Sequence, residues 1–155
     1  MQSEVRRIVI PKEKAVFRLD QYGRWWHDCE KFTHKKIIDH FHHSIHRDSD
    51  GFFLFQSHGN VEEKVYFPYE DTAYFVFDVT ETEPIVIVLN TGRQLLLEPE
   101  NLFLKQDILY VMIEGDPARF TDRAMMRLSP WIEEGEGGFV FVASGVRVPI
   151  RIEPR

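Results

Sequence analysis

The chain has 155 residues, of which 43% are hydrophobic, 28% charged and 14% aromatic, and this composition excludes a disordered or fibrous protein. The net charge of −6 argues against general nucleic-acid binding and against attachment to an anionic membrane surface. Cys29 is the one cysteine and cannot form a disulfide within the chain, and no signal peptide or membrane-spanning run is visible, so we expect a cytoplasmic protein.

The first 72 residues contain short apolar segments separated by turn residues, a pattern typical of strands. Residues 20–23 predict a hairpin turn, because Gly23 is free to take a positive φ. A helix is expected after Thr33, which can cap it, and its apolar face includes Ile37 and Ile45. The turn at residues 48–51 should end this helix. Strands are expected at residues 16–19, 24–27, 52–56 and 64–67.

The rest of the chain shows the same kinds of signal. Thr121 is the expected cap of a second helix, Pro130 should end that helix, and residues 90–93 predict a hairpin turn. Residues 71–155 carry 8 Lys and Arg against 14 Asp and Glu, so the acidity of the protein belongs to this part. Strands are expected at residues 74–79, 85–89, 93–97, 102–104, 109–113, 139–143 and 146–152.

The two halves share one order of signals: a hairpin, a capped helix, a turn glycine and a strand pair. Aligning Thr33 with Thr121 brings Gly51 onto Gly138 after one deletion. We therefore expect an α+β fold of mostly antiparallel sheet, with two diverged β-β-α-β-β repeat units of one helix each, joined by a central strand region. The expected lobes are residues 1–72 and residues 73–155, compact and sharing one core. The alternative is two unrelated hairpins that both use a common threonine cap.

Five of the seven histidines lie between residues 34 and 46. His42 and His46 are spaced i, i+4, which on one helix can hold a metal ion through two imidazoles, with Asp50, or else Asp39 or Asp48, as an oxygen ligand. The sequence has no H-E-x-x-H pattern, no second histidine pair and no cysteine cluster, so we interpret these residues as a polar surface and keep a metal-assisted hydrolase as the alternative. His34 projects near the apolar face and is expected to be a hydrogen-bonded core residue.

Cationic and aromatic side chains gather in the first half of the chain. We expect Arg24, Trp26 and His27 from the first hairpin to bind a ligand, with Arg47 and Lys64 holding its charged groups. This predicts a module without catalytic residues or cofactor that binds a small molecule or a protein partner in a cleft between the two lobes. A structural protein that oligomerises through exposed sheet edges is a further alternative, and a homodimer fits all of these interpretations.

Several short motifs stand out between residues 17 and 73. They are Asp20-x-x-Gly23-x-Trp25, Phe41-x-x-Ser44-Ile45, Arg47-Asp48-x-Asp50-Gly51-Phe52-x-Leu54, Glu63-Lys64-Val65 and Glu70-Asp71-Thr72-Ala73. Together they resemble a bacterial family known as domain of unknown function 1285, although this chain lacks a Thr-Pro before Glu63 and carries Ala73 where the family tends to carry proline. The resemblance implies a two-lobed α+β protein with repeated motifs and a role in ligand binding or signalling, and it implies no catalytic residue.

Overall fold

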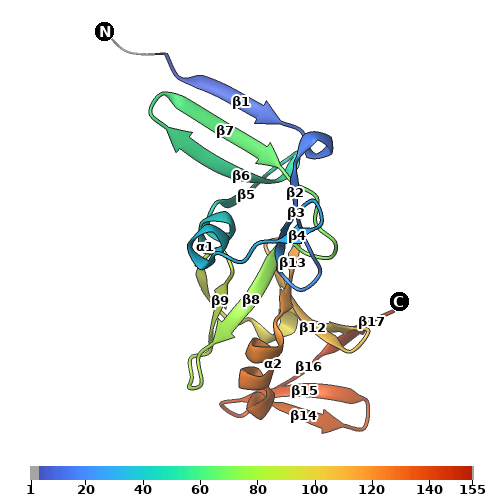
Figure 1. The fold of residues 1–155 in the computed structure, drawn as a ribbon. Helices are drawn as coiled ribbons and strands as arrows, with labels where there is room; N and C mark the ends of the chain where they lie inside the picture. Colours follow the sequence, from blue (N-terminus) through green and yellow to red (C-terminus); the bar gives the residue numbers. More distant parts are fainter. Residues whose placement is uncertain (1–3, 155) are drawn as a thin grey trace. The chain divides into compact units, whose positions relative to one another are not determined.

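The computed structural model describes residues 4–154 and divides the chain into an N-terminal unit, Met1–Ala73, and a C-terminal unit, Tyr74–Arg155 (Figure 1). The division falls one residue after the boundary expected from the sequence. The elements of the N-terminal unit are β1 (Arg6–Ile10), the 3-10 helix η1 (Lys12–Lys14), β2 (Phe17–Leu19), β3 (Trp25–His27), β4 (Glu30–Lys31), α1 (Lys35–His43), β5 (Ile45–Asp48), β6 (Gly51–His58) and β7 (Val61–Tyr66).

Two sheets form the N-terminal unit. The larger has the strand order β1-β7-β6-β5, in which β1 runs parallel to β7 and the other neighbours are antiparallel (Figure 1). The smaller is the antiparallel sheet β2-β3-β4. The predicted strands at 16–19, 24–27, 52–56 and 64–67 correspond to β2, β3, β6 and β7. Three short strands at sheet edges were not predicted: β1, β4 and β5.

Helix α1 is shorter than predicted. It begins at Lys35, so Thr33 is not its cap, and the N-cap residue His34 makes no capping hydrogen bond through its side chain. It ends at His43, and Ile45 belongs to β5, where it pairs with Leu54 of β6. The apolar periodicity through Ile45 predicted a longer helix because it cannot distinguish a helix face from an inward-facing strand residue, and here pairing with β6 decides the outcome.

Aromatic side chains fill the core of the N-terminal unit. Trp25 is buried, and its ring centroid lies 5.3 Å from that of Phe41 on α1 and 5.0 Å from that of Phe67, both in edge-to-face geometry. Phe17 of β2 lies 5.1 Å from Phe41 in the same geometry. Pairs of this kind contribute about 0.5–1.5 kcal/mol beyond the burial of their area. These contacts hold α1 against the β2–β3 hairpin.

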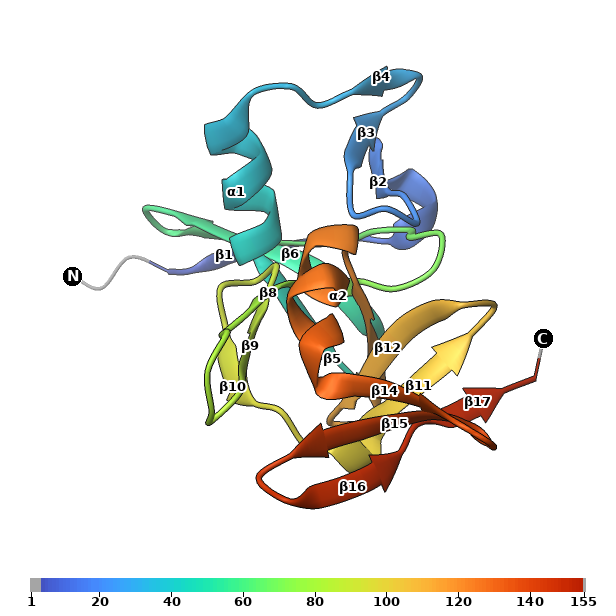
Figure 2. The same cartoon turned by 90° about the horizontal axis from the view of Figure 1, so that it is seen from below.

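The C-terminal unit contains a larger sheet with the order β10-β9-β8-β13-β12-β11-β17 and a smaller antiparallel sheet, β14-β15-β16 (Figure 2). In the larger sheet β13 is parallel to β8 and β11 is parallel to β17, and the remaining pairs are antiparallel. The elements of the whole C-terminal unit are β8 (Tyr74–Val79), β9 (Val86–Leu89), β10 (Gln94–Leu96), η2 (Pro99–Asn101), β11 (Leu102–Lys105), β12 (Ile108–Ile113), β13 (Asp116–Phe120), α2 (Asp122–Leu128), η3 (Ser129–Trp131), β14 (Ile132–Gly135), β15 (Gly138–Ala143), β16 (Val146–Pro149) and β17 (Arg151–Glu153).

Helix α2 agrees closely with its prediction. Thr121 occupies the N-cap, and its side-chain oxygen accepts a hydrogen bond from the Ala124 N–H at 3.2 Å. The helix ends at Leu128, and Pro130 lies in the 3-10 turn η3 that follows. Proline cannot donate the next helical hydrogen bond, which explains the short length of α2. The α+β class with mostly antiparallel sheet, predicted from the sequence, is confirmed.

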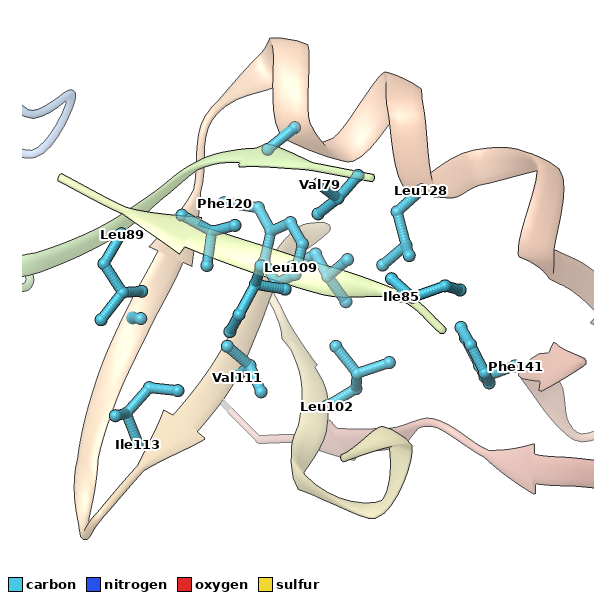
Figure 3. Packing of buried hydrophobic residues seen from close by; sticks show 14 of the residues in the cluster. Val79, Ile85, Leu89, Leu102, Leu109, Val111, Ile113, Phe120, Leu128 and Phe141 are labelled. Carbon is cyan, nitrogen blue, oxygen red and sulfur yellow. The ribbon is translucent and has the colours of Figure 1, made fainter. Parts of the chain in front are cut away.

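Aliphatic side chains dominate the core of the C-terminal unit. Figure 3 shows Val79, Leu109, Phe120 and Leu128 turned toward one another from three strands and α2. Ala124 and Leu128 are fully buried and dock α2 onto this cluster. The buried members are Val76, Val79, Ile85, Ile87, Leu89, Leu102, Leu109, Val111, Ile113, Ala118, Phe120, Ala124, Leu128, Phe141 and Ile150.

The two units share part of their order of elements, although β4 separates the hairpin from α1 in the N-terminal unit. In each, a hairpin (β2–β3 or β12–β13) precedes a helix, and three antiparallel strands follow it. The glycines that the sequence alignment paired, Gly51 and Gly138, open the middle strand of each triplet with φ of 126° and 129°. This backbone region favours glycine. Three strands rather than the expected two follow each helix, and β13 of the second hairpin was not among the expected strands, so the repeat and its origin by duplication stay predictions.

Candidate functional site

The motif Asp20-x-x-Gly23-x-Trp25 forms the turn of the β2–β3 hairpin. The buried Asp20 carboxylate accepts hydrogen bonds at Oδ1 from the backbone N–H groups of Tyr22 and Arg24, each at 2.9 Å. Its Oδ2 accepts a hydrogen bond from Trp26 Nε1 at 2.8 Å. Gly23 has φ of 82°, as the turn prediction required. The carboxylate therefore ties the turn to the strand that follows it, and the motif acts as a folding device.

Three of the predicted ligand-binding residues lie on this hairpin. The exposed Arg24 guanidinium stands 5.7 Å from the ring centroid of the exposed Tyr22. Trp26 is half-buried, and the Arg18 guanidinium lies 5.0 Å from its ring centroid. His27 is exposed at the end of β3. The indole N–H and the ring of Trp26 thus already have partners within the unit.

The other two predicted residues, Arg47 and Lys64, are not brought together. Lys64 Nζ lies 4.4 Å from the ring centroid of Phe53, and Arg47 Cζ lies 5.3 Å from that of Phe52. Successive residues of a strand point to opposite faces of the sheet. Arg47 and Lys64 therefore lie over opposite faces of the four-stranded sheet.

Asp48 holds Lys64 in place. Asp48 Oδ2 accepts hydrogen bonds from Lys64 Nζ at 2.8 Å and from the Tyr66 hydroxyl at 2.6 Å, and Oδ1 accepts one from the Asp50 backbone N–H at 2.9 Å. The hydrogen bond from Lys64, followed by that from Tyr66, lowers the pKa of Asp48 to about 2. The same contacts raise the pKa of Lys64 and that of Tyr66. The charge of Lys64 is accordingly paired within the unit.

His42 is a core residue, which the sequence analysis did not expect. It is 2% exposed, and its Nδ1 accepts a hydrogen bond from Trp25 Nε1 at 3.3 Å. Burial lowers its pKa to about 4, so the imidazole is neutral at pH 7. The prediction of a surface position for His42 is wrong because α1 turns this side toward Trp25. His34, predicted to be the core histidine, is exposed.

The alternative metal site does not assemble. His46 lies in β5 beyond the end of α1, so the helical i, i+4 geometry with His42 does not exist. Its ring stacks on Phe53 at 5.7 Å, and Asp50 is exposed in the following turn. Within residues 4–154, no group of three or more His, Cys, Asp and Glu side chains is placed to hold a metal ion.

The C-terminal unit contains a pocket of about 460 Å³ beside α2. Its floor includes the buried Leu109 and Ile150. Two large apolar side chains at the pocket are exposed, Phe139 by 39% and Met125 by 36%. The lining residues are Leu104, Asp107, Leu109, Met125, Ser129, Ile132, Glu134, Phe139 and Ile150.

The short length of α2 and the alternation of side chains between the two faces of β15 explain this pocket. Phe139 and Phe141 are two residues apart on β15 and share one face of the strand. Phe141 is buried in the core, whereas Phe139 stands at the pocket. The helix wall of the pocket is Met125 and Ser129, and α2 itself ends at Leu128. The side chains around Phe139 leave the space of the pocket unfilled.

Two further pockets lie in the same unit. A pocket of about 550 Å³ is lined by Glu83, Pro84, Ile85, Leu97, Pro99, Phe141, Ala143, Ser144 and Val146. A smaller pocket of about 150 Å³ is lined by Ile87, Leu95, Leu96, Glu98, Asn101, Val111, Met112, Ile113 and Glu114. The charged lining residues of both already have partners: Glu83 accepts from the Ser144 hydroxyl, Glu98 from Asn101 Nδ2, and Glu114 pairs with Arg93.

Sequence reasoning missed the pocket beside α2. Its lining residues lie between positions 104 and 150 and come from β11, β12, α2, β14, β15 and three segments outside them: the β11–β12 turn, η3 and the link between β16 and β17. Each apolar lining residue fits the pattern of an ordinary core position in its own part of the chain, so no local pattern indicates a cavity. No helix among residues 4–154 combines the length and the apolar character needed to cross a bilayer.

Two solved structures are similar to this chain. A DUF1285 family protein from Silicibacter pomeroyi DSS-3 matches with a TM-score of 0.65 and 19% identity, over 92% of this chain and 82% of that protein. A DUF1285 family protein from Shewanella baltica OS155 matches with a TM-score of 0.51 and 18% identity, over 72% of this chain and 87% of that protein. No protein-family model matches the sequence, and no curated protein matches it. The chain has the fold of DUF1285 family proteins, which confirms the resemblance at the level of fold.

Proposed function

We propose that this chain, which has the fold of DUF1285 family proteins, is a binding module that takes a small apolar molecule in the pocket beside α2. The observation that carries the proposal is the pocket itself: a space of about 460 Å³ with a buried apolar floor and two large apolar side chains exposed at its mouth. Pockets that bind small molecules usually measure about 300–1,000 Å³ and are mostly apolar.

A bound apolar molecule would stabilise the unit. It would cover Phe139 and Met125, which are partly exposed to water, and burial of apolar surface is worth about 25 cal/mol per Å². Met125 is a flexible side chain that can adjust to the shape of a ligand. The polar Ser129 hydroxyl already donates to the Met126 carbonyl at 2.7 Å, so the apolar residues supply the free surface.

This proposal differs from the sequence-based expectation in its location. The sequence predicted a cleft between two lobes with Arg24, Trp26, His27, Arg47 and Lys64 as ligand-binding residues. The pocket beside α2 belongs to one unit and contains none of them. The cleft stays a prediction, as does the role in signalling that the family resemblance implies.

A pair of neighbouring substitutions tests the proposal, with octanol as an apolar probe and calorimetry as the measurement. Met125→Trp places a larger side chain at the mouth of the pocket and should reduce octanol affinity by about tenfold or more. Met126→Trp makes the same change one residue later, at a side chain that is 74% exposed and does not line the pocket, and should leave the affinity unchanged. Absence of octanol binding to the wild type, or equal binding by both variants, would contradict the proposal.

A second candidate function is binding of a protein partner at the turn of the β2–β3 hairpin. The observation that favours it is the exposed pair of Tyr22, 57% exposed, and Arg24, two residue types enriched in interfaces. The partner proposed here is a second copy of the chain. Sedimentation velocity over a range of concentrations should then show a dimer that Tyr22→Ser weakens, and a monomer at all concentrations would count against it.

A further inference from the structure

We infer that the ligand of the pocket beside α2 is a cationic amphiphile: an apolar molecule that ends in an amine or another positively charged group. This inference rests on the proposed function, because it names the chemical class of ligand for the same pocket. It is carried by the two charged residues of the lining, Asp107 and Glu134, which are both acidic.

The two carboxylates stand without partners. Asp107 and Glu134 are exposed, and neither side-chain carboxylate forms a hydrogen bond or ion pair with another residue in the range 4–154. Asp107 lies in the β11–β12 turn and has φ of 65°, while Glu134 lies on β14. The lining therefore combines one apolar surface with two carboxylates contributed by separate elements.

The charged residues of the other two pockets differ from Asp107 and Glu134 because they have partners. Their charged lining residues are Glu83, Glu98 and Glu114, and each is already bonded to a neighbouring side chain. Only in the pocket beside α2, of these three, are carboxylates left to meet a ligand. The glutamate side chains in the other two pockets therefore already have bonding partners within the unit.

The charge of the lining also selects against other ligands. Among residues 4–154, no lysine, arginine or histidine lines the pocket, so a fatty acid or a phosphorylated molecule would bring its negative charge toward two carboxylates with no described cation to offset them. An amine would instead form charge-assisted hydrogen bonds with those carboxylates while its apolar body covers Leu109, Phe139 and Ile150. The excess of acidic residues in positions 71–155 favours the approach of a cation as well.

Three probes of equal chain length separate apolar binding from charge recognition. Octylamine, octanol and octanoate are titrated into the wild-type protein at low ionic strength, with calorimetry as the measurement. Octylamine should bind more tightly than octanol by up to about tenfold, since two solvent-exposed ion pairs are worth at most about that factor. Octanoate should bind more weakly than octanol. Added salt should reduce these differences, because both carboxylates are open to solvent.

The double variant Asp107→Asn, Glu134→Gln should remove the preference for octylamine and leave the affinity for octanol unchanged. Asparagine tolerates the positive φ of position 107, so the turn should be retained. Glu136→Gln is the matched control, because Glu136 is exposed in the turn after β14 but does not line the pocket, and it should keep the full preference. If octanol binds and octylamine binds no more tightly, the inference fails and the proposed function stands. If octanol does not bind, both fail.

Discussion

The two units bury a short helix against antiparallel strands with different kinds of side chain. The N-terminal unit packs Trp25, Phe41 and Phe67 edge to face and adds buried polar groups, Asp20 and His42, that are all hydrogen-bonded. The C-terminal unit has a core made mainly of valine, isoleucine and leucine, with Phe120 and Phe141 among them, and a pocket lies beside α2. Rings and hydrogen bonds together form the core of the N-terminal unit, whereas the mainly aliphatic core of the C-terminal unit ends at a short helix with a pocket beside it.

The largest effect is expected where the aromatic core is opened. Trp25→Ala removes the ring that contacts Phe41 and Phe67 and leaves the imidazole of His42 without its donor. We expect the free energy of unfolding to fall by about 4 kcal/mol, as for other truncations of large buried rings, measured by urea denaturation. Trp26→Ala is the control, since Trp26 is half-buried. Equal losses from both substitutions would show that the ring of Trp25 has no special place in the core.

The next largest effect is a loss of stability in mild acid. The pKa of His42 is about 4 in the folded protein against about 6.5 in the unfolded chain, so between these values the unfolded state binds more protons. The contribution of the neutral His42 to the free energy of unfolding is therefore fully present above about pH 6.5 and is lost as the pH drops to about 4. The loss from this residue should be about 3 kcal/mol, measured as the free energy of unfolding at a series of pH values.

Two variants isolate the contribution of His42. His42→Gln keeps an oxygen that can accept from Trp25 and does not titrate, so the fall between pH 6.5 and 4 should become shallower. His43→Gln changes an exposed neighbour and should keep the slope of the wild type. The Asp48 carboxylate, with its pKa of about 2, contributes its own loss only as the pH falls below about 4. The same slope in His42→Gln and in the wild type would refute the assignment.

The smallest effect is expected at the pocket of the C-terminal unit. Phe139→Ala should lower the free energy of unfolding by less than about 1 kcal/mol, because this ring is 39% exposed and lies outside the packed core. Phe141→Ala, at the same face of β15, should cost about 4 kcal/mol because Phe141 is 3% exposed. Thermal or urea unfolding of both variants checks the ratio. A large loss from Phe139→Ala would mean that Phe139 is a core residue and that the pocket is not an open site.

Most strands and the C-terminal helix could be predicted from the sequence because their signals are local. The strand at 74–79 agrees with β8 in both bounds, and the Thr121 cap and Pro130 delimit α2. The N-terminal helix was predicted too long. Ile45 continues the helical spacing of apolar residues, but it lies in β5, after the end of α1. Alternation and helical periodicity look alike over so few residues.

The sequence alone determined the strand-rich architecture, the hairpin turn at Asp20 and Gly23, and the acidity of residues 71–155, since each depends on residues near one another in the chain. Tertiary structure decided the state of His42, which is set by Trp25, seventeen positions earlier. It also decided the candidate site, whose lining is assembled from positions 104 to 150. A cavity exists only where separate elements meet without filling the space between them, and that depends on packing rather than on any local pattern.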